Sequence, residues 1–299
     1  MKKTAFFIIT SLFLVSAALA ADSQIWGEMM IPNILDYGKE GSLDLGPLFT
    51  LLQGTYFRWV FLAITVGVPT IFLVHYLVWG PKVFSHGGDK IYIFSLFQRI
   101  VHLLAVISFL VLVPTGLMMV FGRYLGGGTP VYLARNLHAM ATVVFFIAVF
   151  PMFLCWCLDM LPSTDDIKWV FILGGYLSKK KREIPAGKFN AGQKMWFWVA
   201  TLGGMVMIAT GLMMYFQDFN LGIARTLGLS QIDLLRGAAI VHNVLAALIT
   251  AFFFTHAYMS LFAIKGAIHS IITGYKEEEE VKYLHSSYYK KLQQQRAKS

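Results

Sequence analysis

The sequence predicts an all-α membrane protein that crosses the bilayer five times. Of its 299 residues, 57% are hydrophobic and only 14% are charged, whereas a soluble domain carries roughly 25% charged residues. Five apolar runs are each long enough to span a bilayer, which takes about 20 helical residues. They cover roughly residues 57–78, 100–121, 133–158, 195–216 and 237–264. In addition, Lys and Arg gather in alternate connecting segments, as expected of a multi-pass chain.

The first twenty residues have the pattern of a cleavable secretory signal. Two lysines precede an apolar stretch, Phe6 to Val15, and small residues lead to Ala20. An uncleaved anchor helix is the alternative. Cleavage would leave residues 21–56 as a polar segment in the periplasm of a bacterium, followed by an extra first transmembrane helix at 57–80.

Charge predicts the orientation of the spans. Seventeen of the 25 Lys and Arg residues fall in segments that a periplasmic N-terminus would place inside, namely 80–99, 159–194 and the C-terminal end. This bias agrees with the positive-inside rule. We therefore expect an inner-membrane protein with a solvated cytoplasmic tail at 276–299. The net charge of +9 is then a consequence of topology, and no nucleic-acid partner is expected.

Four histidines in these runs match in depth. His242 and His256 are fourteen residues apart, so on one α-helix they would share a face within ~40° and stand ~21 Å apart. In the orientation above, His102 lies toward the cytoplasm and His138 toward the outside. Depth therefore pairs His138 with His242, and His102 with His256. Histidine at membrane depth is costly and usually functional, and two such pairs are typical of two bis-histidine haems, one in each leaflet.

A short internal repeat lies near the predicted outer centre. The sequence Thr115–Met119 recurs as Thr210–Met214, in two helices that run the same way. Gly116 is fourteen residues past His102 and so shares its face at the depth of the outer centre. Gly116 and Gly211 are candidate haem contacts, because glycine lets a flat macrocycle approach the backbone. Contact between helices through small residues is the alternative.

Two arginines stand at the outer ends of histidine-bearing helices, Arg135 and Arg236. Haem propionates usually lie near cations, so both are candidates to hold them. Interface anchoring or a role as topology charges is the alternative.

The segment PAGKFNAGQKMWFW, residues 185–198, resembles the signature ahead of the third core helix in cytochrome b (gamma) subunits of respiratory formate dehydrogenases. The resemblance covers residues 92–275 and includes the four histidines in the expected order, together with His256–Met259 and Ile264–Gly266. It implies a four-helix dihaem cytochrome b domain at 92–275 that holds two b-type haems. It assigns His138 and His242 to the outer haem, and His102 and His256 to the inner haem.

The resemblance also implies a quinone site beside the cytoplasmic haem, for menaquinone or ubiquinone. It assigns Asn190 and Gly192 to that site, with His256 nearby. A quinone needs an apolar slot and a few polar groups at its carbonyls, and Gln193 lies with them where the loop enters the membrane. The alternative is that Asn190 is simply the N-cap ahead of Ala191, and both roles are compatible.

By resemblance, the chain would pass electrons in anaerobic respiration from a periplasmic iron–sulfur (beta) subunit through both haems to quinone. A molybdenum or tungsten catalytic (alpha) subunit would oxidise formate, so formate oxidation itself is not expected on this chain. Related cytochromes serve nickel–iron hydrogenases and thiosulfate reductases. A hydrogenase or a thiosulfate reductase is therefore the alternative complex for this chain.

Two other classes fit less well. A transporter with histidine proton relays would need acidic residues within the spans, and the interiors of the five runs hold none. A haem-free anchor for a dehydrogenase would explain the helices but not the histidine spacing. His75 is expected to be an interfacial or hydrogen-bonded histidine, and His86, His269 and His285 are assigned no chemistry. Trp169, Trp196 and Trp198 are expected in an aromatic belt.

Overall fold

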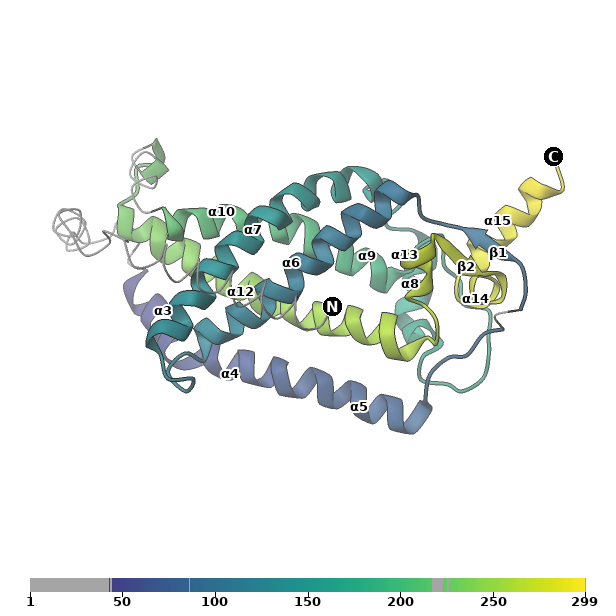
Figure 1. Cartoon of the computed structure of the whole chain (residues 1–299), viewed down its shortest axis with the longest axis horizontal. Coiled ribbons are helices and arrows are strands. Elements are labelled where there is room, and N and C mark those ends of the chain that lie inside the picture. Colours follow the sequence, from purple (N-terminus) through teal and green to yellow (C-terminus); the bar gives the residue numbers. More distant parts are fainter. Residues whose placement is uncertain (1–42, 44, 86, 217–222, 225, 299) are drawn as a thin grey trace, which may run out of the picture. The chain divides into compact units, whose positions relative to one another are not determined.

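The computed structural model describes residues 43, 45–85, 87–216, 223, 224 and 226–298 (Figure 1). The predicted signal peptide, 1–20, and most of the predicted periplasmic segment lie outside these residues. Within them, five helical spans are long and apolar enough to cross a membrane, at Gly46–Trp79, Leu96–Val120, Gly128–Trp156, Ala191–Tyr215 and Gln231–Ala263. The prediction of an all-α protein with five spans is confirmed.

Several spans are built from α-helical pieces joined by π-helical turns (η). The first comprises α3 (Gly46–Leu51), η2 (Leu52–Tyr56), α4 (Phe57–Leu62), η3 (Ala63–Gly67) and α5 (Val68–Trp79). The second is α6 (Leu96–Val120) and the third is α7 (Gly128–Trp156). The fourth comprises α9 (Ala191–Trp198), η5 (Val199–Gly203) and α10 (Gly204–Tyr215), and the fifth comprises α12 (Gln231–Tyr258) and η6 (Met259–Ala263).

Short elements connect the spans or follow them. They are β1 (Lys90–Tyr92), α8 (Thr164–Phe171), the 3₁₀ turn η4 (Leu173–Gly175), α13 (His269–Thr273), β2 (Tyr275–Glu277), α14 (Glu278–Leu284) and α15 (Ser286–Arg296).

All five spans begin earlier than the sequence predicted, the first and the fifth by the most. The first begins at Gly46 rather than at 57, because Pro47 occupies the first turn, where its missing N–H costs nothing. The fifth begins at Gln231 rather than at 237 and carries Asp233 in its first turn. Asp233 is 1% exposed and accepts a hydrogen bond from the Ser230 hydroxyl at 2.8 Å. A carboxylate is favoured at this end of a helix by the positive end of its dipole.

The chain divides into two compact units. Of the described residues, unit 1 takes in those up to Trp59, with those of 109–143 and 209–243, and unit 2 takes in those of 60–108, 144–208 and 244–298. The predicted histidine pairs are divided between them. His138 and His242 belong to unit 1, and His102 and His256 belong to unit 2.

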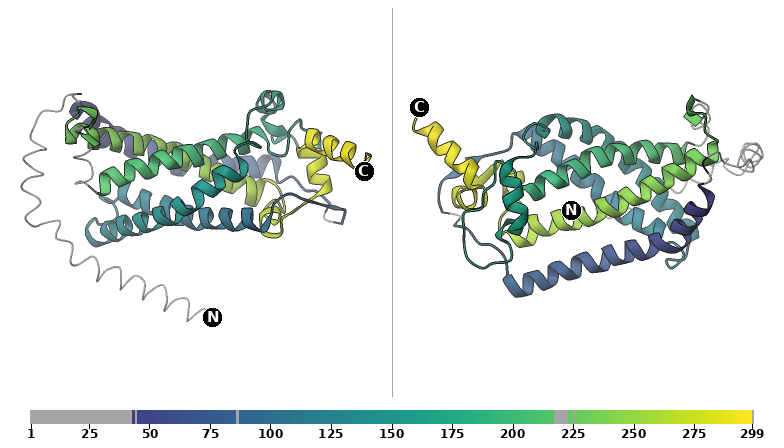
Figure 2. Two further views of the ribbon diagram at one scale, coloured as in Figure 1. Left: turned by 90° about the horizontal axis from the view of Figure 1, so that it is seen from above. Right: turned by 180° about the vertical axis from the view of Figure 1, so that it is seen from behind.

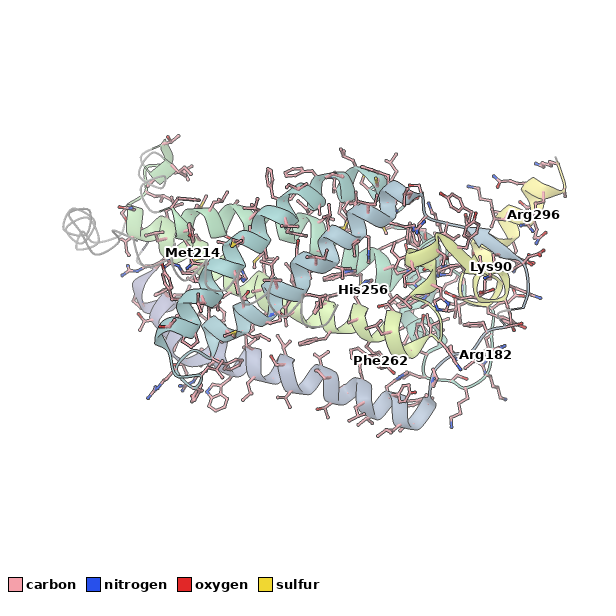
Figure 3. All side chains as sticks on the ribbon, in the orientation of Figure 1. Lys90, Arg182, Met214, His256, Phe262 and Arg296 are labelled. Atoms are coloured by element: carbon pink, nitrogen blue, oxygen red, sulfur yellow. The ribbon has the colours of Figure 1, made fainter. Side chains whose placement is uncertain are left out.

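The C-terminal residues of unit 2 form a packed assembly. β1 pairs with β2 in antiparallel register, with Lys90 opposite Glu277, and α14 and α15 follow (Figures 1 and 2). Lys90, labelled in Figure 3, also forms an ion pair with Glu277 at 3.7 Å. Val281 and Leu284 of α14 are buried. Leu284 belongs to a buried hydrophobic cluster with Phe84, Tyr176, Ile184 and Ile264.

The prediction of a solvated tail at 276–299 is therefore wrong for its first half. Glutamates at 277–280 suggested a solvent-exposed segment by composition alone. The structure turns Glu280 inward, where it is 4% exposed, and pairs it with Lys276 at 2.8 Å. Val281 and Leu284, three residues apart on α14, form its buried apolar face. The ion pair with Lys276 offsets the cost of burying the Glu280 carboxylate beside them.

Candidate functional site

Unit 1 brings together the first predicted pair of histidines. His138 comes from α7 and His242 from α12. Their ring centroids lie 6.4 Å apart and their planes are inclined by 56°. Both side chains are half-buried.

Unit 2 brings together the second predicted pair. His102 of α6 and His256 of α12 have ring centroids 6.1 Å apart, with planes inclined by 55°. Trp196 of α9 stacks on His256, with centroids 5.5 Å apart and an interplanar angle of 22° (His256 is labelled in Figure 3). Trp196, expected in an aromatic belt, thus contacts a candidate haem ligand.

Both separations fit a metal held between the two rings. Since a metal–imidazole nitrogen bond is about 2 Å long and a ring nitrogen lies about 1.2 Å from the ring centroid, a shared iron would separate two facing centroids by about 6.4 Å. The observed 6.1 Å and 6.4 Å agree with this value. The residues present therefore fit two bis-histidine haems, one in each unit.

The repeated Thr-Gly sequence lies against the histidines of unit 1. A Cβ atom at Gly116 would lie 3.5 Å from Cε1 of His138, and a Cβ atom at Gly211 would lie 3.5 Å from Cε1 of His242. Any larger side chain would extend into the space beside these rings. The two glycines thus lie against the two histidine rings of unit 1, and their place beside a haem stays a prediction.

Sequence reasoning missed the two threonines of the same repeat. Oγ1 of Thr115 lies 2.9 Å from Nδ1 of His138, and Oγ1 of Thr210 lies 3.0 Å from Nδ1 of His242. The repeat itself was the available signal, but only its glycines had an interpretation. The direction in which the two threonines point depends on the rotation of each helix about its own axis. The sequence alone does not give that rotation.

The candidate propionate arginines have aromatic or backbone neighbours. The guanidinium of Arg135 lies over the rings of Tyr132 and Tyr215, 6.0 Å and 5.4 Å from their centroids. Arg236 lies beside Gly46, where a Cβ atom would be 3.2 Å from the guanidinium. Neither arginine forms an ion pair with a carboxylate in the described part of the chain, and their role toward haem propionates stays a prediction.

The candidate quinone residues gather at the start of α9. Oδ1 of Asn190 accepts a hydrogen bond from the Gln193 backbone N–H at 3.0 Å, and Oε1 of Gln193 accepts one from the Asn190 N–H at 2.9 Å. Asn190 is therefore the N-cap, as the alternative reading predicted. Within the described residues, the side-chain NH₂ groups of Asn190 and Gln193 take no part in this capping box. A Cβ atom at Gly192 would lie 2.9 Å from Trp169, so packing by itself requires a glycine there.

The first span contacts α12, which carries two of the candidate histidines, within each unit. In unit 1, Asn243 donates a hydrogen bond to Gln53 at 3.4 Å, directly after His242. In unit 2, His75 lies 2.6 Å from the hydroxyl of Tyr258, two residues after His256. The prediction that His75 is a hydrogen-bonded histidine is confirmed.

Comparison with known proteins gives one family. The family described as "Prokaryotic cytochrome b561" matches residues 93–274. The "Formate dehydrogenase, cytochrome b556 subunit" of Haemophilus influenzae is 28% identical over 197 residues, 64% of this chain and 79% of that protein. Two Escherichia coli K12 proteins are 26% identical. They are the nitrate-inducible formate dehydrogenase cytochrome b556(Fdn) subunit, over 57% of this chain and 75% of that protein, and the formate dehydrogenase cytochrome b556(fdo) subunit, over 68% and 94%.

Proposed function

The chain belongs to the prokaryotic cytochrome b561 family and is a multi-pass membrane protein, and from this we propose that it is the dihaem membrane subunit of a formate dehydrogenase. Membership of the family implies haem b. The relatives named as formate dehydrogenase subunits support the choice of complex.

The observation that carries the proposal is the pair of facing imidazole couples. His138 and His242 would hold one haem through their ring nitrogens, and His102 and His256 would hold a second. A haem b bound there would supply one-electron redox chemistry. Two imidazoles per iron would leave no ligand position open to oxygen or substrate, so the chain's own contribution would be electron transfer.

The proposed partners lie on opposite faces of the membrane. An iron–sulfur subunit would donate electrons at the periplasmic face, and a molybdenum or tungsten subunit would oxidise formate there. Quinone would be reduced near the cytoplasmic face. The excess of Lys and Arg in the segments assigned to the inside supports this orientation.

The start of α9 is the proposed quinone contact. The free NH₂ groups of Asn190 and Gln193 would donate to quinone carbonyls, while their oxygens hold the helix cap. Trp196, in the second turn of the fourth span, stacks on His256, so the same helix end would contact the ligand of the nearer haem. Gly192 would contribute by allowing close packing.

Substitution of the four histidines tests the proposal. Purified wild-type protein should contain two haems per chain. His138→Ala and His242→Ala should each remove the same haem, so the double variant retains as much as either single variant. His102→Ala and His256→Ala should each remove the other haem. His269→Ala, at an exposed histidine, should retain both.

The complex itself tests the choice of partner reaction. Membranes from cells that make the chain with its neighbouring subunits should reduce quinone on addition of formate, and both histidine pairs should be required. Full haem content in all four variants would overturn the ligand assignment. Haem-dependent quinone reduction with hydrogen but not with formate would overturn the formate assignment alone.

A further inference from the structure

We propose that Thr115 and Thr210 hold His138 and His242 in the tautomer that offers Nε2 to iron, and that the two hydrogen bonds lower the reduction potential of the haem between them. This inference rests on the proposed function, because it requires a haem in unit 1.

The hydrogen-bond inventory of Thr115 determines the tautomer of His138. A threonine hydroxyl has one proton to donate. Oγ1 of Thr115 lies 2.6 Å from the carbonyl oxygen of Val111, which can only accept, so the hydroxyl proton points there. At 2.9 Å from the same Oγ1, Nδ1 of His138 must therefore carry a proton and donate it. The lone pair of a neutral ring is then on Nε2.

The second half of the repeat places its threonine and glycine against His242 as the first half does against His138. Oγ1 of Thr210 lies 3.0 Å from Nδ1 of His242. The positions that a Cβ atom would take at Gly116 and at Gly211 are 3.5 Å from Cε1 and 3.9 Å from Nδ1 of the facing histidine in both cases. Two helices from different parts of the sequence thus present the same Thr-Gly surface to the two rings of one pair.

The chemistry of metal-bound histidine gives this contact a function. A hydrogen bond accepted from the second ring N–H orients the ring and makes the ligating nitrogen more basic. A more basic axial ligand stabilises ferric iron relative to ferrous iron and lowers the potential. Two threonines acting on both axial ligands of one haem would therefore act in the same direction.

Valine has nearly the shape of threonine but lacks the hydroxyl acceptor, so Thr115→Val and Thr210→Val test the proposal. Redox titration of the purified full-length chain should resolve two haem components, and the one lost in His138→Ala identifies the haem of unit 1. In each valine variant this component should move to a more positive potential. A tenfold fall in the stability of ferric relative to ferrous haem corresponds to a rise of 59 mV in the reduction potential of a one-electron couple.

Two controls separate tuning from general destabilisation. Thr115→Ser keeps the hydroxyl and should restore the wild-type potential and the electron paramagnetic resonance g-values of that haem. Thr201→Val removes a fully buried hydroxyl that bonds to Phe197 of its own helix at 2.7 Å and should move neither component. If Thr115→Val does not accumulate, Thr210→Val gives the same measurement on the other ligand.

The possible results are distinct. Two bound haems with unchanged potentials in the valine variants would overturn this inference and leave the proposed function intact. An equal shift in Thr115→Ser or in Thr201→Val would also overturn it. Absence of haem from the wild-type chain would overturn the proposed function itself.

Discussion

Nδ1 of His75 lies 2.6 Å from the hydroxyl oxygen of Tyr258. Nε2 of His75 lies 3.1 Å from the carbonyl of Tyr176, which can only accept, so Nε2 carries the proton and Nδ1 accepts from the tyrosine. Phe72 stacks on the Tyr258 ring at 4.4 Å. The first span, which lies outside the matched family region, thereby holds α12 two residues beyond His256.

Tyr258→Phe should weaken this attachment. It removes the donor to a half-buried nitrogen, and we expect the free energy of unfolding to fall by about 1–2 kcal/mol. Haem should then be released at a lower temperature, which absorbance during a thermal ramp in detergent measures. Tyr124→Phe alters a 68% exposed tyrosine and should leave the release temperature unchanged. Equal behaviour of the two variants would show that the hydrogen bond has no stabilising role.

Side chains at the two repeat glycines should block haem binding in unit 1. Valine at Gly116 or Gly211 would extend beyond a Cβ atom already 3.5 Å from a histidine ring, into the space beside that ring. We expect each variant to bind one haem rather than two, as measured by pyridine haemochrome assay per mole of protein. Gly67→Val, with no atom within 4 Å of its Cβ position, should keep both. Two haems in the Gly116 and Gly211 variants would contradict the assigned position of the macrocycle.

The C-terminal assembly should loosen as the pH falls, because His285 is buried in neutral form. Nδ1 of His285 donates to the Gly187 carbonyl at 2.8 Å, and Nε2 accepts from Lys276, which also pairs with Glu280. Burial, and next the positive charge of Lys276, lower the pKa of His285 to about 3, from about 6.5 in an unfolded chain. Between these values the unfolded state binds more protons, so stability is complete above about pH 6.5 and is lost as the pH falls toward 3.

Hydrogen exchange of residues 276–298 at pH 7, 5.5 and 4.5 measures this effect. The wild-type segment should exchange faster at each lower pH, after correction for the intrinsic rate. His285→Asn should largely remove that dependence, whereas His269→Asn, at an exposed position, should retain it. An unchanged pH dependence in His285→Asn would assign the transition to another group.

Two Lys–Asp pairs of nearly equal length should differ in their contribution to stability. Lys194 pairs with Asp166 at 2.7 Å with both side chains largely buried, whereas Lys188 pairs with Asp159 at 2.8 Å with both partly exposed. Lys194→Met would leave a carboxylate without its partner in a site of low exposure and should cost about 3 kcal/mol. Lys188→Met should cost less than about 1 kcal/mol. Chemical denaturation followed by circular dichroism compares them, and equal losses would contradict the role of burial.

Hydropathy and spacing alone predicted the five spans, the four histidines and their pairing by depth. Those features depend on local composition and on the helical period, which a single chain displays directly. An internal recurrence of sequence drew attention to the Thr-Gly repeat, and the family resemblance of residues 185–198 drew attention to the loop ahead of α9. Composition misled at the tail, because it does not say which glutamate of a run turns inward. Glu280 does so on a helix whose Val281 is buried and whose Leu284 joins the cluster with Phe84 and Ile264.

The tertiary structure decided which side chains meet. That Thr115 faces His138, that Trp196 stacks on His256, and that His75 bonds to Tyr258 all depend on the rotation of each helix about its own axis. That rotation is set by packing between residues far apart in the sequence, so no local pattern contains it. The amino-acid sequence thus determined the elements and their candidate ligands, and the packing of those elements determined the hydrogen bonds that orient them.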